Sequence, residues 1–171
     1  MTQALYLAMA LLVGAGSGLQ LAMLGAVGRQ RGPLEATWVT ILGTVVGAAL
    51  LLALRSARGE ALLPAPFDRA ALYAVVAVLA GVALVLSVRE MEPYFALMGL
   101  FGLGVVFAGA YLGPRLGVAL FISALIAGQM LAALALDHVG AFGAAVQSAT
   151  ALRMAGVAAL ILGVALVRGW D

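Results

Sequence analysis

Long apolar stretches alternate with short polar breaks along the whole chain, and each stretch is about as long as a membrane-spanning helix. A helix needs about 20 apolar residues to cross the hydrocarbon core of a bilayer. Strands of a transmembrane barrel would instead show alternating segments of about ten residues. The pattern predicts six helical spans: Ala4–Val27, Leu34–Leu54, Ala70–Val88, Tyr94–Leu112, Leu116–Leu136 and Ala151–Val167.

Charged and turn-forming residues collect in the five breaks between these spans, at 28–33, 55–69, 89–93, 113–115 and 137–150. Helices suit lipid because they satisfy their own backbone hydrogen bonds. We therefore expect an all-α integral membrane protein, a polytopic bundle of six transmembrane helices in one domain spanning 1–171. The weakest span is 70–88, and the bundle has five helices if that segment does not cross.

Composition supports lipid as the solvent. Of the 171 residues, 65% are hydrophobic and 9% are charged, whereas a soluble globular domain carries about 25% charged residues. The net charge of +2 comes from scattered arginines, so no basic patch is available for nucleic acid. The absence of cysteine excludes disulfides and thiolate metal sites, and we expect no metal and no cofactor.

The arginines are divided almost evenly between the two sides of the membrane. If all six segments span, Arg55, Arg58, Arg69, Arg115 and Arg168 face Arg29, Arg31, Arg89 and Arg153. The positive-inside rule then favours neither orientation. We therefore expect copies to insert both ways and to pair as an antiparallel homodimer. The alternative is a single orientation set by one or two dominant arginines.

The two halves of the chain also resemble each other weakly. A shift of 81 residues aligns Gly32 with Gly113 and Pro33 with Pro114, among other pairs. Two three-helix repeats, 4–88 and 94–167, would be inverted relative to each other, as in many transporters. The alternative is chance, since segments built from Gly, Ala, Val and Leu match easily.

Glycines fall on stripes along the predicted helices. The six that we expect to pack against neighbouring helices are Gly14, Gly18, Gly43, Gly47, Gly109 and Gly128. Small residues let helix backbones approach closely in lipid, where no hydrophobic force drives helices together. Tight packing is the simpler interpretation, and sliding of these faces during transport is the functional one.

Polar side chains within the spans are expensive and therefore informative. The candidates for substrate binding are Gln20, Gln129, Thr40 and Thr44. For each glutamine, the alternative is a hydrogen bond between helices. For the threonines, the alternative is a bond to a carbonyl of their own helix, four residues earlier.

Glu35 is the candidate for proton or ion coupling. It follows Pro33 at the predicted start of the second helix, where an acid also favours the positive end of the helix dipole. The alternative is therefore a capping charge at the membrane interface. The pair Asp137–His138 is interpreted as a solvated helix end.

Several motifs resemble the YdcZ-like family of the drug/metabolite transporter superfamily. They are Gly113-Pro-Arg-Leu-Gly117, Ile126-Ala-Gly-Gln129, Leu136-Asp-His-Val-Gly140, the helix 156–167, the stretch from Gln20 to Gly28-x-x-x-Gly-Pro-Leu34, and the helix 40–52. The resemblance implies a small bacterial inner-membrane protein, typically of five helices. It also implies a relationship to small multidrug resistance exporters, which work as antiparallel pairs.

The chain departs from that pattern in three ways. The segment 70–88 exceeds the usual number of helices. Met23 and Leu24 stand where the family often has Asn, and the first helix has no central Glu like that of the small multidrug exporters. Proton exchange through such a Glu is therefore not expected.

These features favour a bacterial inner-membrane transporter embedded in the lipid bilayer. It would move a small organic metabolite or hydrophobic compound by alternating access, as a dimer. The alternative is a non-transporting membrane subunit or anchor for a partner protein. An enzyme is not expected, because the spans contain no converging nucleophile, acid and base.

Overall fold

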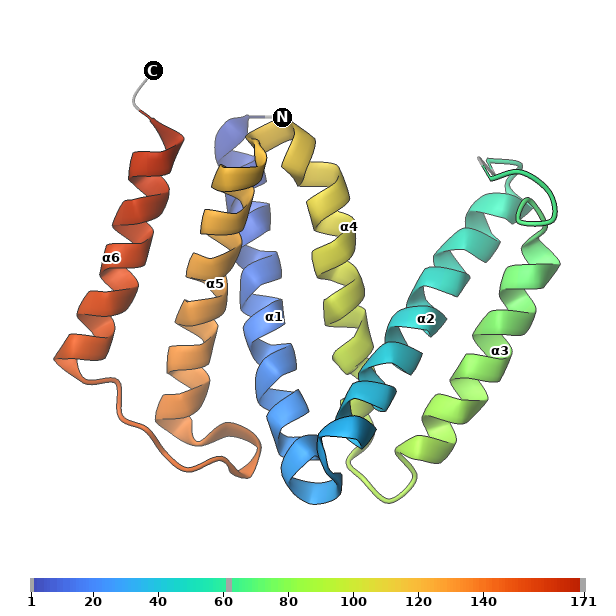
Figure 1. Cartoon of the computed structure of the whole chain (residues 1–171), viewed down its shortest axis with the longest axis horizontal. Coiled ribbons are helices and arrows are strands. Elements are labelled where there is room, and N and C mark those ends of the chain that lie inside the picture. The colour runs from blue at the N-terminus through green and yellow to red at the C-terminus, as the bar shows by residue number, and fades with distance from the viewer. Residues whose placement is uncertain (1, 61–62, 170–171) are drawn as a thin grey trace. The chain divides into compact units, whose positions relative to one another are not determined.

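The computed structural model describes residues 2–60 and 63–169, and over these residues it is all-α. The long helices, in chain order, are α1 (Gln3–Arg31), α2 (Pro33–Ala57), α3 (Ala70–Ser87), α4 (Met98–Leu116), α5 (Val118–Val139) and α6 (Ala151–Arg168) (Figure 1). Two short 3-10 helices, η1 (Pro93–Leu97) and η2 (Ala141–Gly143), precede α4 and follow α5.

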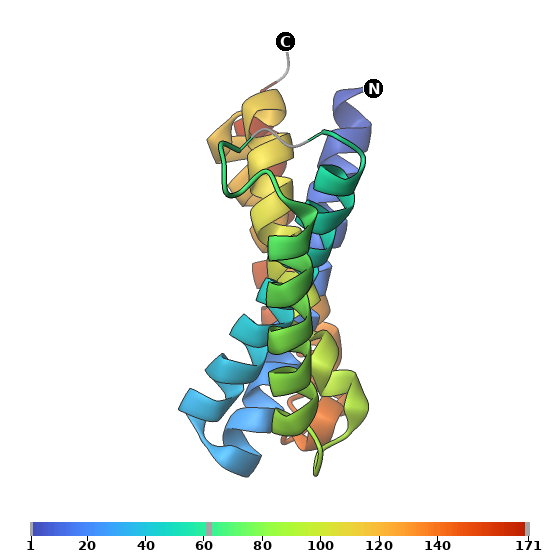
Figure 2. The same cartoon turned by 90° about the vertical axis from the view of Figure 1, so that its right-hand side faces the viewer.

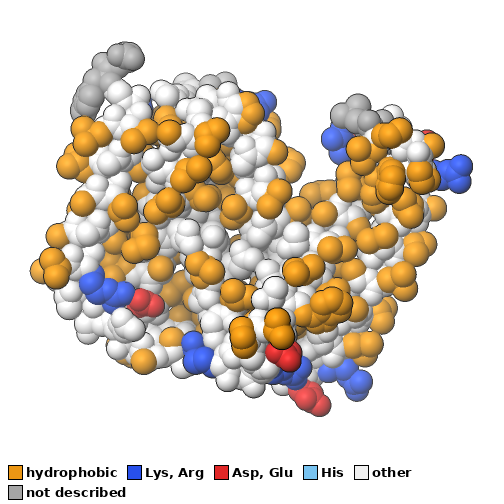
Figure 3. Space-filling model, in the orientation of Figure 1, with side chains coloured by type: hydrophobic (Ala, Val, Ile, Leu, Met, Phe, Trp, Pro, Cys, Tyr) orange, Lys and Arg blue, Asp and Glu red, His pale blue; other side chains and the backbone are white. Residues whose placement is uncertain are grey.

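All six helices are long and apolar enough to cross a membrane, with α4 counted together with η1. The predicted six-helix architecture is therefore confirmed, and the segment 70–88 forms a helix, α3, that is long and apolar enough to span. On the face shown in Figure 3, apolar side chains cover the helices and the charged side chains lie toward the helix ends. This distribution suits an apolar solvent around the middle of each helix.

Two predicted breaks between helices are placed differently in the structure. Helix α1 continues through the expected break to Arg31, and only Gly32 separates it from α2. Helix α4 likewise continues through Pro114, and only Gly117 separates it from α5. A proline in the last turn removes few helix bonds, and the carbonyl oxygens of Tyr111 and Gly113 accept from the Arg115 side chain and the Gly117 N–H. The helices therefore end at the two glycines with positive φ and not at the prolines.

The chain divides into two compact units. The terminal unit consists of residues 1–26 and 104–171, and the middle unit consists of residues 27–103. Helices α1 and α4 contribute to both. The N-terminal part of α1 belongs to the terminal unit and its end to the middle unit, whereas the start of α4 belongs to the middle unit and the rest to the terminal unit.

The terminal unit packs α5 and α6 with most of α1 and α4. Its core contains small residues together with Leu112 and Phe121, and Ala10 and Ala124 are fully buried there. Among the described residues of α6, only Val157 is buried. The start of α6 is held by Arg153, whose guanidinium lies 2.5 Å from a carboxylate oxygen of Asp137 at the end of α5.

The middle unit is built on the antiparallel hairpin of α2 and α3, which lie side by side (Figures 1 and 2). The buried residues of α3 recur every three or four positions, at Tyr73, Ala77, Ala80 and Leu84, and so form one face. The start of α2 is joined to the end of α3 by a side-chain hydrogen bond. The indole N–H of Trp38 donates to the Ser87 hydroxyl at 3.2 Å.

Candidate functional site

The crossing of α1 and α5 in the terminal unit brings the backbones of the two helices into contact. A Cβ atom at Gly14 would overlap the carbonyl of Leu125, and one at Gly18 would lie 2.7 Å from the carbonyl oxygen of Gln129. A Cβ atom at Gly128 would overlap the carbonyl of Leu11. Glycine is therefore required at three positions of this crossing, and the crossing places Gln129 directly against α1.

The side-chain amide of Gln129 is the unused polar group at this crossing. The residue is half-buried, and the amide makes no hydrogen bond to any residue that the structure describes. An amide in an apolar environment costs free energy unless it is hydrogen-bonded. Gln129 therefore presents donor and acceptor atoms that a bound molecule can satisfy.

Gln20 lies on the same unit but on another face of α1. It follows Gly18 by two residues, which turns its side chain by about 200° from the face toward α5. It is also half-buried, and within the described part of the chain its amide has no hydrogen-bond partner. The structure therefore does not bring Gln20 and Gln129 to the same helix contact.

The two candidate threonines lie on α2 in the middle unit and are already hydrogen-bonded. The Thr40 hydroxyl donates to the carbonyl oxygen of Ala36 at 2.9 Å. The Thr44 hydroxyl lies 3.0 Å from the carbonyl oxygen of Thr40 and 2.9 Å from that of Gly99 on α4. Thr40 is thus used within its own helix, whereas Thr44 joins two helices.

Glycines also line the contact between α2 and α4 in the middle unit. A Cβ atom at Gly43 would lie 3.0 Å from Cα of Gly99, and one at Gly47 would lie 2.7 Å from the Leu103 side chain. Gly109 differs from these residues, since a Cβ atom there would meet Phe121 at an ordinary contact distance of 3.6 Å. The close approaches of α2 and α4 thus coincide with Gly43 and Gly47.

Glu35 lies in the first turn of α2 and is exposed. Its carboxylate lies over the junction with α1. A Cβ atom at Gly32 would lie 2.9 Å from one of the carboxylate oxygens. The neighbouring Arg31 is engaged elsewhere, with its guanidinium 2.9 Å from the Ser87 carbonyl oxygen and 3.4 Å from Glu90. Glu35 is thus at the end of a span and accessible.

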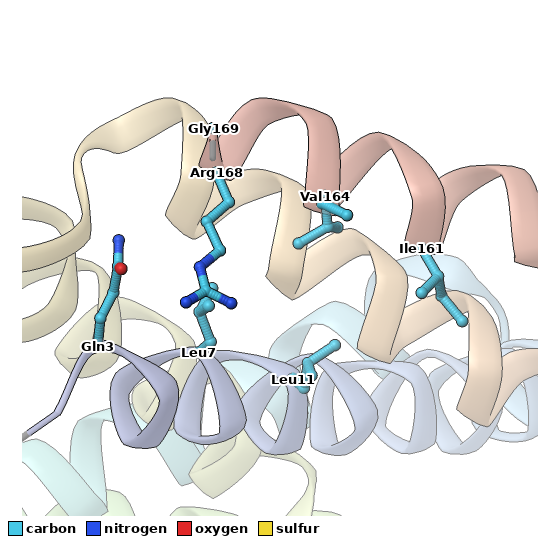
Figure 4. A pocket seen from close by; sticks show the side chains of 8 residues that line it. Gln3, Leu7, Leu11, Ile161, Val164, Arg168 and Gly169 are labelled. Atoms are coloured by element: carbon cyan, nitrogen blue, oxygen red, sulfur yellow. The ribbon is translucent and has the colours of Figure 1, made fainter. Parts of the chain in front are cut away.

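A groove of about 460 Å³ lies between α1 and α6 in the terminal unit (Figure 4). Its sides are mostly apolar and include Leu7, Leu11 and Val164. At its end, the Arg168 side chain extends from α6 toward α1 beside Gln3. Neither Gln3 nor Arg168 was expected from the sequence, because both stand at helix ends where polar residues are common.

The structure offers no metal centre within its described residues, since no three His, Asp or Glu side chains come together there. The polar chemistry of the spans therefore rests on amides and hydroxyls. Such groups can orient a bound molecule through hydrogen bonds.

Comparison with known proteins identifies a family. A family model described as "Putative inner membrane exporter, YdcZ" matches residues 5–166, a range that includes all of α3. No curated protein and no solved structure matches the chain.

Proposed function

Because the chain belongs to the YdcZ family of inner membrane exporters, we propose that it moves a small organic metabolite or hydrophobic compound across this membrane by alternating access. The chain is a multi-pass inner membrane protein of an exporter family. The observation that carries the proposal is the Gln129 amide at a helix crossing, which has no hydrogen-bond partner among the described residues.

Three properties of Gln129 support a role in substrate binding. It lies well inside α5, it is half-buried, and its amide has no protein partner among the described residues. A polar group in this condition is expensive in lipid, and a substrate hydroxyl, amine or carbonyl would compensate that cost. Gln20 shares these properties and is the second residue proposed to contact substrate.

Thr40 and Thr44 have a smaller part in this proposal. Their hydroxyls already donate to backbone carbonyls, so they can offer a substrate only acceptor lone pairs. Glu35 remains the candidate for coupling to protons or cations, because it is an exposed acid at the end of a span.

We propose that the working unit contains two inverted parts, as do many transporters that work by alternating access. The balance of arginines favours an antiparallel homodimer as the source of these parts. The second half of the same chain is another source.

The test is release of compounds from proteoliposomes that contain the purified protein. The vesicles are loaded with ethidium and with radiolabelled amino acids and nucleosides, and release is compared with that from protein-free vesicles. We expect Gln129→Leu to abolish release of any compound that the wild type exports, while the protein still folds. Gln30→Leu, at an exposed position near the end of α1, is the matched control.

Two outcomes would count against this function. Unchanged release by Gln129→Leu would remove Gln129 from the site. Failure of the wild type to release any compound, together with stable copurification of another protein, would favour the membrane subunit or anchor.

A further inference from the structure

The helix crossings in the two units repeat each other residue by residue. In the terminal unit, Gly14 of α1 lies against the backbone of Gln129 of α5, and in the middle unit, Gly99 of α4 lies against the backbone of Thr44 of α2. Gly99 follows Gly14 by 85 positions, and Gln129 follows Thr44 by the same number. One contact is thus made twice, with the first and second halves of the chain exchanging roles.

Two further pairs of contacts keep the same spacing of 85 residues. In each pair, one contact joins α1 to α5 and the other joins α4 to α2. The pairs are Leu11–Gly128 with Ala96–Gly43, and Gly18–Ala132 with Leu103–Gly47. In the last pair Leu103 stands where the terminal unit has Gly18, so the match is one of position in space and not of residue type.

The junctions between helices repeat at this spacing as well. Gly32 and Gly117 are 85 positions apart, with φ values of 102° and 82° and extended ψ values of 161° and 144°. Each donates its N–H to the carbonyl oxygen of the glycine four residues earlier, at 3.0 and 2.9 Å. Each carbonyl oxygen then accepts from the fourth residue of the next helix, at 3.2 and 3.0 Å. Chance similarity of apolar sequences would not reproduce these backbone bonds at the spacing of the crossings.

We propose that the chain is a fused pair of equivalent three-helix copies, α1–α3 and α4–α6, that exchange their first helices. Helix α1 of the first copy packs on α5, and α4 of the second copy packs on α2. Because each helix stands three spans, an odd number, before its counterpart, the copies enter the membrane in opposite orientations. The spacing of these copies is 85 residues in the exchanged region, in place of the 81 that the aligned glycines and prolines indicate.

The consequence of this inference for transport rests on the proposed function. If export proceeds by alternating access, one chain already supplies both inverted parts, and no oppositely inserted second chain is needed.

The equivalence also separates the roles of two candidate residues. Thr44 donates its hydroxyl across its crossing to the carbonyl oxygen of Gly99, which holds α2 and α4 together. Gln129 occupies the equivalent position at the other crossing, but its amide is free of the residues described. Thr44 is therefore a positioning residue. At the equivalent position of the other crossing, the Gln129 amide is left to bind a substrate.

The experiment compares Gln129→Thr with Gln129→Val in lipid nanodiscs, by the midpoint of thermal unfolding. The two side chains have nearly the same shape, so the comparison isolates the hydroxyl. We expect the Thr variant to unfold about 2 °C higher, because its hydroxyl donates to the Gly14 carbonyl as Thr44 donates to Gly99. The same pair of substitutions at Ile126, an exposed position on α5, is the control for a hydroxyl that can bond only within its own helix.

Equal midpoints for the two variants, or the same difference at Ile126, would overturn the equivalence. A second pair, Gln129→Ser and Gln129→Ala, repeats the comparison if the β-branched variants do not fold. The unfolding midpoint does not depend on transport. A wild type without export activity would therefore contradict the proposed function and leave this comparison unaffected.

Discussion

The hydroxyl of Thr44 on α2 lies 2.9 Å from the carbonyl oxygen of Gly99 on α4. A Cβ atom at Gly99 would overlap the backbone of Thr44, so this hydrogen bond is possible only because position 99 has no side chain. The bond joins two helices at the point of their closest approach. Removing this bond would therefore measure how much one polar contact between helices contributes to the stability of the middle unit.

We expect Thr44→Val to lower the free energy of unfolding by about 0.5–1.5 kcal/mol, because the bond between helices is lost. Thr40→Val is the matched control, since its hydroxyl bonds only to Ala36 of its own helix. Thermal unfolding in nanodiscs measures both variants. Equal losses for the two would show that the bond to Gly99 contributes nothing beyond the bond within α2.

Glycine positions that look alike in sequence should respond oppositely to alanine. Gly14→Ala and Gly99→Ala should destabilise by about 1–3 kcal/mol, because the new Cβ meets backbone that cannot move aside. Gly104→Ala and Gly163→Ala should be neutral or stabilise by up to about 1 kcal/mol, since open space surrounds them and alanine favours helix. Thermal unfolding of all four variants checks this prediction. Destabilisation of similar size at all four positions would contradict it.

The loop between α5 and α6 should depend on Arg153. Its guanidinium donates to the carbonyl oxygen of Gln147 at 2.9 Å and lies 2.5 Å from Asp137, so it connects the loop to α5. Both side chains of the ion pair are partly exposed, and we expect Arg153→Gln to cost at most about 1 kcal/mol.

Hydrogen exchange is the sharper measurement for this variant. The amides of residues 144–152 should exchange several-fold faster in Arg153→Gln than in the wild type. Arg168→Gln, at the other end of α6, should leave them unchanged. Similar exchange in both variants would mean that Arg153 does not hold the loop.

The orientation of the chain distinguishes the two sources of an inverted pair. Reporter proteins fused to the C-terminus, one active only inside the cell and one only outside, measure it. The fused pair predicts a signal from one reporter. Comparable signals from both would instead support the antiparallel homodimer that the even distribution of arginines favours.

Glu35 is tested through the driving force for transport. If it couples export to protons, Glu35→Gln should remove the dependence of release on an imposed pH gradient and keep release down a substrate gradient. Glu92→Gln, at an exposed acid before η1, is the control. An unchanged response to the pH gradient would assign Glu35 only a capping role at the start of α2.

The number of helices and most of their ends could be predicted from the sequence, but the ends of α1 and α4 could not. Length and apolar composition alone determine whether a segment can span a bilayer, and these properties are visible in the sequence. The break expected at Gly113–Arg115 lies at Gly117 instead, because the Arg115 side chain and the Gly117 N–H donate to carbonyl oxygens of the last turn of α4, at Tyr111 and Gly113. Such compensation depends on neighbouring atoms that a local pattern does not reveal.

The candidate site was predictable only as a set of residue types. The sequence shows that Gln129 and Thr44 are polar residues within apolar helices. It does not show that the Thr44 hydroxyl is bonded across a crossing while the Gln129 amide has no partner in the described part of the chain. It also gives Gly14 and Gly109 the same expected role, although only Gly14 meets the backbone of another helix closely. Both distinctions require contacts between residues far apart in the chain.

The single-residue junctions at Gly32 and Gly117 have a consequence for how the protein is made. With a single residue between α1 and α2, and again between α4 and α5, the chain has almost no length for a loop outside the membrane. We therefore expect each pair of helices to enter the bilayer together rather than one helix at a time. Arg29 and Arg31, in the last turn of α1, would then act on the orientation of the pair α1–α2 as a whole.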